Sequence, residues 1–217
     1  NVYGGFAGTE TSLEERSLHE HPTYLDGSHA QRVLYQSEPL AEETAVVWDG
    51  FVIRNGYMRS GACYDYSTTM LAHPREDSYY SLKLQGAGAV LMDNVTLRHV
   101  SFEGNFIALQ REYDNRVNGN ALGMSGGRLD HVSVVNNTTD YVSDVNSMAN
   151  SYVYVVNAQI DSCSFTHNVG KMALYGCTVN ASRFEYNQVR AELPVMDDLN
   201  EAELYVDAST MRYCFLS

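Results

Sequence analysis

The stretch LGMSGGRLDHVSVVNN, residues 122–137, and the later stretch VYVVNAQIDSCSFTHN, residues 153–168, place similar residues at the same positions. Residues 90–105 and 172–187 follow the same sixteen-position template, in which successive gaps are 2, 5, 3, 2 and 3 residues. The four sets are Val90, Met92, Leu97, Val100, Phe102, Asn105; Leu122, Met124, Leu129, Val132, Val134, Asn137; Val153, Val155, Ile160, Cys163, Phe165, Asn168; and Met172, Leu174, Val179, Ser182, Phe184, Asn187. An internal repeat of this kind indicates stacked structural units.

The gaps predict a solenoid of β-strands. A gap of two places both side chains on one face of a strand, whereas gaps of five and three carry the chain around corners. A single coil cannot bury its own apolar row, so successive coils must stack and pair in parallel. We therefore predict an all-β, right-handed parallel β-helix with Val90–Asn187 as its regular core. The alternative is an antiparallel sandwich, which would require hairpin signals at short spacing, and few are present.

A polar residue closes each copy of the repeat. Asn tolerates left-handed backbone angles and suits a tight corner, and stacked Asn amides are able to hydrogen-bond from coil to coil. Partial copies flank the core, and in the first of them Gly56 takes the position of the Asn. These partial copies are Trp48, Phe51, Ile53 and Gly56 before the core, and Val206, Ser209, Met211 and Cys214 after it.

The template divides the chain into a cap and a stack of coils within one domain, 1–217. Residues 1–45 are expected to cover or begin the stack, with strand-like pieces at 1–6, 22–27 and 32–35 and a capping-box helical turn from Ser12 to Glu15. Residues 46–217 form the coils, which are interrupted by insertions. The insertions are 57–89, 106–121, 138–152 and 188–203, and the first three leave from the same corner.

Composition narrows the classes of partner. The net charge is −13 and only two lysines, Lys83 and Lys171, occur, which argues against nucleic acid or an anionic membrane surface. The absence of a long apolar run predicts no membrane insertion. The four cysteines, Cys63, Cys163, Cys177 and Cys214, lack metal-ligand spacing and are interpreted as free thiols.

The insertions supply the candidate binding residues. Long loops on one side of a solenoid are usually its working surface. Tyrosines beside Arg and Asp suit a neutral glycan or a protein surface, and the alternative is that these tyrosines pack over the edge of the core. The predicted ligand-binding residues are Tyr66, Tyr79, Tyr80, Arg111, Tyr113 and Asp114, and the wider tyrosine set includes Tyr57 and Tyr152.

The coils offer a second, catalytic hypothesis. The residue between the first inward pair of each coil (Leu91, Gly123, Tyr154, Ala173) provides no acid, base or metal ligand. Acidic and basic residues occur in another column, in the later half of each coil. This column is expected to comprise Arg98, Asp130, Asp161, Asn180 and Asp207, with His99 and His131 beside it. Asp130 and Asp161, one strand spacing of about 4.8 Å apart, would approximate the carboxylate pair of a retaining glycosidase. The alternatives are corner residues bonded to local backbone, or a Ca²⁺ ion bridging the two aspartates.

These residues resemble a known group. The runs VYGGFAGTETSLEERS (2–17) and WDGFVIRNG (48–56), together with coils such as IDSCSFTHN (160–168), are similar to bacterial surface β-helix proteins of the pectin-lyase-like type common in Bacteroidetes. The resemblance implies export and display at the outer cell surface, and it specifies no reaction. We thus expect a non-catalytic exported module that binds glycan or protein, with a polysaccharide lyase or glycoside hydrolase as the alternative.

The last coil leads to a separate expectation. Residues 204–217 copy the later half of a coil, so we expect them to leave an open strand edge. Such an edge predicts pairing with another copy or domain, or continuation of the chain.

Overall fold

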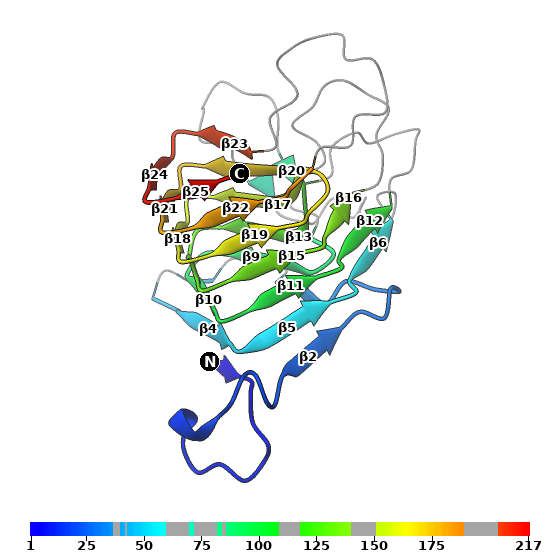
Figure 1. The fold of residues 1–217 in the computed structure, drawn as a ribbon, viewed down its shortest axis with the longest axis vertical. Helices are drawn as coiled ribbons and strands as arrows, with labels where there is room; N and C mark the ends of the chain where they lie inside the picture. The colour runs from blue at the N-terminus through cyan, green and yellow to red at the C-terminus, as the bar shows by residue number, and fades with distance from the viewer. Residues whose placement is uncertain are drawn as a thin grey trace.

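The fold is built from parallel sheets. The computed structural model describes residues 1–36, 40–41, 43–59, 70–71, 82–83, 86–108, 118–139, 151–188 and 204–217. Within these ranges four parallel sheets, here called A, B, C and D, run along the stack, and one antiparallel pair joins β7 (Met70–Leu71) to β8 (Leu82–Lys83). Figure 1 shows the strands of successive coils lying over one another from the N-terminal to the C-terminal end. This topology is compatible with a parallel β-helix-like solenoid.

Sheets A and B each contain seven strands. Sheet A consists of β1 (Val2–Tyr3), β4 (Val46–Asp49), β10 (Val95–Arg98), β14 (Arg128–Asp130), β18 (Gln159–Asp161), β21 (Thr178–Asn180) and β24 (Thr210–Arg212). Sheet B consists of β2 (Thr23–Asp26), β5 (Phe51–Arg54), β11 (Ser101–Glu103), β15 (Ser133–Val135), β19 (Ser164–Thr166), β22 (Arg183–Glu185) and β25 (Phe215–Leu216).

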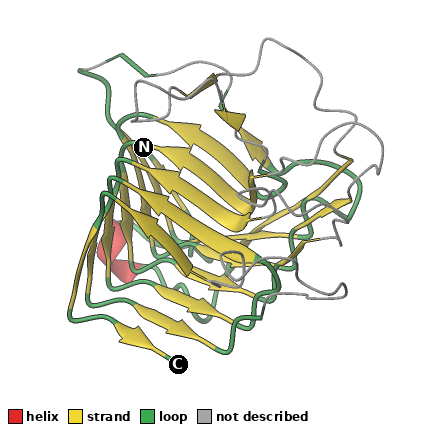
Figure 2. Ribbon diagram, turned by 90° about the horizontal axis from the view of Figure 1, so that it is seen from above, coloured by secondary structure: helices red, strands yellow, loops and turns green. Residues whose placement is uncertain are grey.

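Sheets C and D complete the coils. Sheet C consists of β3 (Leu34–Tyr35), β9 (Ala89–Met92), β13 (Asn118–Ser125), β17 (Ser151–Val156), β20 (Lys171–Tyr175) and β23 (Leu204–Asp207). Sheet D consists of β6 (Tyr57–Arg59), β12 (Phe106–Ala108) and β16 (Thr138–Thr139). The chain passes repeatedly from C to A to B, and in three coils it continues into D. Figure 2, seen from above, shows the strands of neighbouring coils in stepped rows around one interior.

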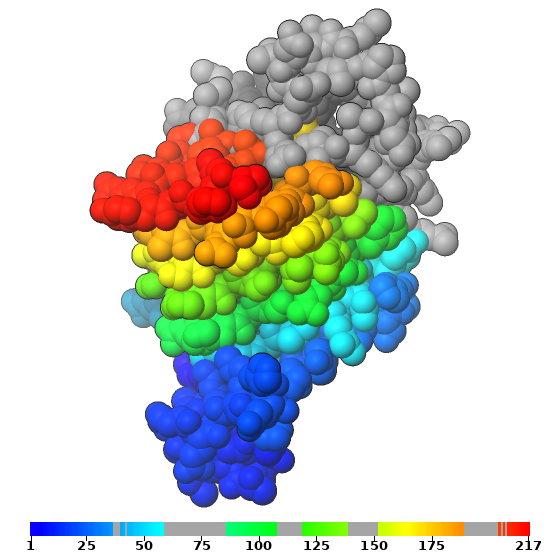
Figure 3. Space-filling view, in the orientation of Figure 1, coloured from blue at the N-terminus to red at the C-terminus, as the bar shows by residue number. Residues whose placement is uncertain are grey.

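The predicted inward columns stack as the repeat requires. Leu97, Leu129, Ile160 and Val179 are register partners from coil to coil, and each is fully buried. A second column runs through sheet B, where Phe165 and Phe184 stack face to face at 5.0 Å between ring centroids. Large buried side chains repeated along one axis give the stack a continuous apolar core. Figure 3 shows the coils as successive colour bands along the molecule.

The first coil departs from the predicted register. Ala89 and Leu91, not Val90 and Met92, pair with the inward Leu122 and Met124. The cause is one additional residue at the corner that follows, where Asp93 and Asn94 both have positive φ (51° and 34°). This extra residue forms a local bulge. As a result, the side chains of β9 that face inward are shifted by one position along the strand.

The predicted Asn ladder is present and buried. Asn105 Nδ2 donates to Asn137 Oδ1 (2.9 Å), Asn137 Nδ2 to Asn168 Oδ1 (3.0 Å), and Asn168 Nδ2 to Asn187 Oδ1 (3.0 Å). Each Oδ1 also accepts the backbone N–H of the preceding Asn in the row, and Gly56 N–H donates to Asn105 in the same way (2.9 Å). The ladder joins the corners that follow sheet B.

The expectation that the Asn closing each coil adopts a left-handed backbone was wrong. The left-handed residue is the one immediately before the ladder position, at Asn55, Gly104, Asn136, His167 and Tyr186, with φ between 53° and 60°. Gly56 is required for space instead, since a Cβ there would lie 2.2 Å from Ala87 O and 2.7 Å from Asn105 Oδ1. Amide pairing selects the ladder residues, not left-handed φ.

The N-terminal region begins the stack. Its strands β1, β2 and β3 each add a parallel strand to the end of sheets A, B and C. The expected capping box was wrong in detail: Ser12 makes no capping side-chain bond to the 3₁₀ helix η1 (Leu13–Glu15), and the Glu15 carboxylate instead accepts the Thr11 N–H (2.8 Å). No described helix is long and apolar enough to cross a membrane.

The boundaries of the predicted insertions shift inward. Residues 57–59, 106–108 and 138–139 form sheet D, while 118–121 and 151–152 already belong to β13 and β17. At the other end, β23–β25 pair with the preceding coil, and their apolar side chains are less covered. Val206 is 37% exposed and Leu216 is 59% exposed, whereas their partners Leu174 and Phe184 are buried.

Candidate functional site

The candidate site lies at the corner between sheets A and B, which we call the A–B corner. One left-handed residue forms this corner in each coil: Gly50, His99, His131, Ser162, Ala181 and Tyr213, with φ between 48° and 83°. The backbone N–H of each of the first five donates to a carbonyl of the next coil, as from His99 to Asp130 O (3.0 Å). Because the corners are bonded to one another, residues at equivalent positions project side by side.

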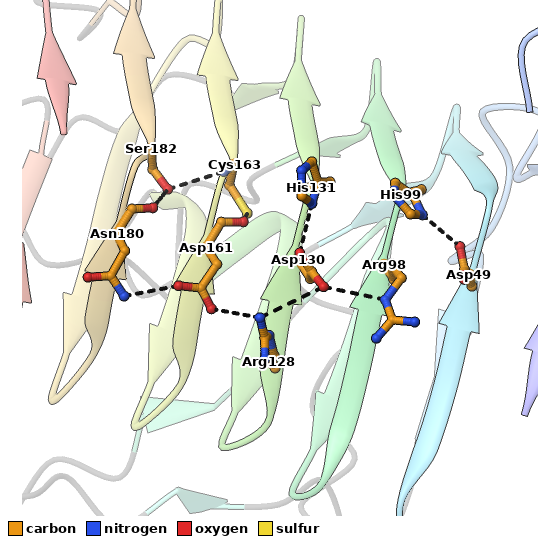
Figure 4. A network of polar contacts seen from close by, with 10 residues as sticks. All are labelled: Asp49, Arg98, His99, Arg128, Asp130, His131, Asp161, Cys163, Asn180 and Ser182. Atoms are coloured by element: carbon orange, nitrogen blue, oxygen red, sulfur yellow. Dashed lines mark hydrogen bonds and ion pairs between the residues drawn. The ribbon is translucent and has the colours of Figure 1, made fainter. Parts of the chain in front are cut away.

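A row of charged and amide side chains precedes these corner residues. The row is Asp49, Arg98, Asp130, Asp161, Asn180 and Arg212, in register from coil to coil. Arg212, not the expected Asp207, takes the last position, because Asp207 pairs with Tyr175 in sheet C. Figure 4 shows most of this row, with Arg128 between the two central aspartates.

Arg128 binds both central carboxylates. Its Nη2 lies 3.1 Å from Asp161 Oδ2 and 3.8 Å from Asp130 Oδ2. Arg98 Nε donates to Asp130 from the other side (3.4 Å), and Asn180 Nδ2 donates to Asp161 Oδ1 (2.9 Å). The row is therefore an intramolecular ladder in which neighbouring coils neutralise each other's charge.

The environment of Asp130 keeps this carboxylate ionised. Partial burial raises its pKa, but the hydrogen bond to His131, the positive charges of Arg128 and Arg98, and that of His131 when it is protonated outweigh this effect and lower the pKa below its ordinary value. A general acid at neutral pH needs the opposite, a raised pKa. Asp130 is thus suited to accept hydrogen bonds and not to deliver a proton.

Two histidines stand beside the row. His131 Nδ1 lies 2.7 Å from Asp130 Oδ1, and His99 Nδ1 lies 3.0 Å from Asp49 Oδ1. Asp49 is buried and also accepts Arg16 Nη2 (2.8 Å). The two imidazole rings are adjacent, with centroids 5.4 Å apart and planes tilted by 38°.

The structure brings together the three residues of the catalytic hypothesis, Asp130, Asp161 and His131. The two aspartates are direct strand partners, as the repeat predicted. The Arg128 guanidinium, however, lies within ion-pair distance of both carboxylates, although Asp161 Oδ2 accepts no hydrogen bond from it. In the described part of the chain, no group of three or more His, Cys, Asp or Glu side chains converges to hold a metal ion.

The structure does not describe the predicted binding residues. Tyr66, Tyr79, Tyr80, Arg111, Tyr113 and Asp114 all lie outside the described residues. Two tyrosines of the wider set are described, and both pack. Tyr57 stacks with Phe106 at 6.1 Å between centroids, and Tyr152 is 1% exposed within the main core cluster.

The outward column of sheet C is also buried. Because of the register shift its first member is Val90, not Leu91, and Val90 clusters with Tyr154, Val156, Ala173 and Tyr175. Each of these is at most 4% exposed. This face is a second apolar layer and not an open groove.

Three residues in or against the charged row escaped the sequence reasoning: Asp49, Arg128 and Arg16. Asp49 was missed because the column was begun at Arg98, and Arg128 because only one residue per coil was considered. The signal was present: Arg128 lies two residues before Asp130, so both project from the same side of β14. Arg16, by contrast, belongs to an irregular segment, and no periodicity places it beside Asp49.

Comparisons with known proteins assign no family to this arrangement. No family model matches the chain, and neither a curated protein nor a solved structure gives a significant match. The fold assignment consequently rests on the strand topology and the repeated corners described above.

Proposed function

We propose that this chain is a non-catalytic, exported surface module whose coil stack presents binding segments on one side. In this proposal the solenoid is the right-handed, pectin-lyase-like form suggested by the sequence resemblance. Right-handed crossovers are the rule for parallel strands joined within one sheet. The location is the outside of a bacterial cell, and the partner is a neutral glycan or a surface protein.

One observation carries the proposal. The chain leaves the coils after β6, β12 and β16, which pair in register with one another. It returns at β9, β13 and β17, which also pair in register. The connections between these two sets are therefore anchored side by side in three successive coils. A rigid stack that repeats its exit at one corner suits the display of binding segments.

The charged row supports the non-catalytic part of the proposal. The carboxylates of Asp130 and Asp161 are both ion-paired with Arg128, and the pKa of Asp130 is lowered. A glycoside hydrolase needs one carboxyl group that stays protonated near neutral pH. Assays for reducing ends and unsaturated products on a polysaccharide panel are expected to show no activity, and activity abolished by Asp130→Asn would overturn this conclusion.

A binding experiment tests the module itself. The purified chain is applied to a glycan array and to a pull-down with bacterial surface proteins, alongside the triple variant Tyr79→Ala, Tyr80→Ala, Tyr113→Ala. We expect the triple variant to lose about 10-fold or more in affinity, since buried aromatic contacts dominate such interfaces. Binding that survives the triple substitution, or no binding by the original chain, contradicts the proposal.

The control uses exposed tyrosines that lie outside the three predicted binding segments. Tyr213 is 92% exposed at the A–B corner, and Tyr186 is 65% exposed at a corner after sheet B. Tyr186→Ala with Tyr213→Ala removes exposed aromatic surface without altering the predicted binding segments. This variant is expected to bind as the original chain does.

A further inference from the structure

The two histidines of the A–B corner form a feature that the proposed function does not use. His99 and His131 occupy the same left-handed position in neighbouring coils, with φ of 48° and 53°. Their backbone N–H groups are both bonded to the following coil, at 3.0 and 3.1 Å. The two side chains therefore leave the backbone at adjacent positions, about one strand spacing of 4.8 Å apart.

Both rings contact a carboxylate through Nδ1, but from different coils: His99 reaches Asp49 of the preceding coil, whereas His131 contacts Asp130 of its own coil. Both carboxylates are also paired with arginine, Arg16 and Arg98 respectively. A carboxylate paired with arginine accepts hydrogen bonds, so Nδ1 is the nitrogen that donates; whenever the ring carries a single proton, Nε2 keeps its lone pair.

The remaining nitrogens are available to a ligand. Within the described ranges no hydrogen bond engages Nε2 of either ring, and the side chains are 42% and 59% exposed. Histidines that bind a metal through one ring nitrogen commonly donate the other N–H to a carboxylate, and His99 and His131 each place Nδ1 against one. Two such histidines stand next to each other here, with ring centroids 5.4 Å apart.

From this geometry we propose that His99 and His131 together bind one divalent transition-metal ion of the Zn²⁺ type through their Nε2 atoms. Metal–imidazole bonds of about 2.0–2.1 Å bring two coordinating nitrogens to within roughly 3.4 Å of each other. The ring centroids are 5.4 Å apart and both side chains are partly exposed, so metal binding requires side-chain rotation that brings the two Nε2 atoms to this distance. Imidazole nitrogen favours Zn²⁺, Cu²⁺ or Ni²⁺ over Ca²⁺ or Mg²⁺.

The site is open. The protein contributes two ligands among the described residues, in agreement with the absence there of any cluster of three or more metal-binding side chains. Water or an external donor completes the coordination shell. Asp49 and Asp130 act as positioning residues that fix the tautomer of each ring.

The test titrates Zn²⁺ into the full 217-residue chain, prepared free of metal, by isothermal titration calorimetry. Two-dimensional ¹H–¹⁵N spectra of the imidazole nitrogens are recorded in parallel. We expect one Zn²⁺ equivalent to bind and the Nε2 signals of His99 and His131 to shift together. His99→Asn and His131→Asn should each weaken this binding by about 10-fold or more; Asn is chosen because it tolerates the left-handed backbone.

Matched controls separate this site from other zinc ligands. His167→Asn changes a histidine that also has left-handed φ (56°) but stacks on Tyr186 and has no second histidine beside it. A double variant, His19→Gln with His21→Gln, removes the His-Glu-His turn near the N-terminus. Both are expected to retain the Zn²⁺ affinity of the original chain, and loss of binding in either, with His99→Asn unaffected, overturns the proposal.

A third set of variants tests the positioning residues. Asp130→Ala is expected to weaken Zn²⁺ binding by about 10- to 100-fold and to redistribute the His131 tautomers. Asp130→Asn, whose amide oxygen still accepts Nδ1–H, should restore most of the affinity. Asp161→Ala removes the other partner of Arg128 and should change nothing. No Zn²⁺ binding by the original chain, or equal effects of Asp130→Ala and Asp161→Ala, would refute the site.

Discussion

Two ladders run along this molecule, and they are built on different chemistry. The Asn ladder is buried and neutral, and the same residue type occupies every position: Asn105, Asn137, Asn168 and Asn187. The charged ladder at the A–B corner is partly exposed and mixes Asp, Arg and Asn in irregular order. Both occupy one position per coil, so the same repeat places them.

Burial explains the difference. An amide donates and accepts at once, so identical Asn residues satisfy each other along a row where water cannot enter. A charged row in that position would need perfect pairing to offset the cost of desolvation. At the exposed corner water screens imperfect pairs, and the order of charges is free to vary. The buried ladder therefore specifies coil stacking, while the exposed ladder tolerates substitution and can acquire other roles.

The largest expected effect breaks the buried ladder. In Asn137→Ala the carbonyls of Phe102 and Val135 lose a donor, and Asn168 Oδ1 loses one as well. The Asn105 backbone N–H and one Nδ2–H lose their acceptor, while Nδ2 keeps its bond to Ile53 O. We expect a loss of about 3 kcal/mol in the free energy of unfolding, because unsatisfied buried groups cost about 1–3 kcal/mol each with partial relaxation. Urea unfolding followed by circular dichroism measures it.

Asn180→Ala is the matched variant on the exposed ladder. It removes a single bond to Asp161 Oδ1 (2.9 Å) from a half-buried position. A loss of about 1 kcal/mol or less is expected. Equal destabilisation by Asn137→Ala and Asn180→Ala would show that burial does not distinguish the ladders.

The sequence repeat predicted the parts of the fold that depend on periodicity. The columns of Leu97 and of Asn105 follow from fixed gaps, because a stacked coil must return equivalent residues to equivalent places. The shifted first coil could not be predicted, since the extra corner residue Asn94 is absorbed by left-handed backbone that leaves no apolar signal. One added residue reverses both faces of a strand.

The candidate site was predicted in outline only. The column rule brought Asp130 beside Asp161, and this pairing is confirmed. The spacing also places Arg128 on the Asp130 side of its strand, but its ion pairs with both carboxylates depend on side-chain conformation, which spacing alone does not give. The tyrosine segments stay a prediction, since Tyr79, Tyr80 and Tyr113 lie outside the described residues.

A smaller effect is expected when the exposed ladder loses its central cation. Arg128→Met keeps the aliphatic stem but removes the charge between Asp130 and Asp161. Because the Arg128 side chain is 43% exposed, solvent screening limits the loss to about 0.5–1 kcal/mol at low salt. The difference from the original chain should shrink in 1 M NaCl, where the Debye length is about 3 Å.

The control for Arg128→Met is Arg183→Met. The Arg183 side chain is 63% exposed and lies 3.8 Å from Glu185 Oε2, so its removal is expected to change the unfolding midpoint very little. A salt-independent loss in Arg128→Met would mean that the stem, and not the charge, holds the ladder together.

The smallest effect concerns a carboxylate held by neither ladder. In the first coils, Asp26 Oδ1 accepts the Ser28 N–H (2.8 Å) and the Asn55 amide (3.1 Å), while Oδ2 accepts Arg54 Nε (2.7 Å). These bonds lower the pKa of Asp26 to about 2, and the Ser28 N–H contributes most, followed by Asn55 and Arg54. A carboxyl-detected NMR titration should find its midpoint there.

The sign of the linkage follows from this lowered pKa. Since the folded pKa lies below the unfolded value, Asp26 stabilises the fold fully above about pH 4, and the contribution is lost as the pH falls through about 2. Arg54→Met should raise the midpoint only in part, because the Ser28 N–H remains in place. A midpoint near the ordinary 3.8 in Arg54→Met would instead assign the shift to charge, and Asp26 would then behave like the salt-screened ladder at the A–B corner. A midpoint that stays low in 1 M NaCl would show that an exposed carboxylate here depends on backbone donors, as the buried Asn ladder does.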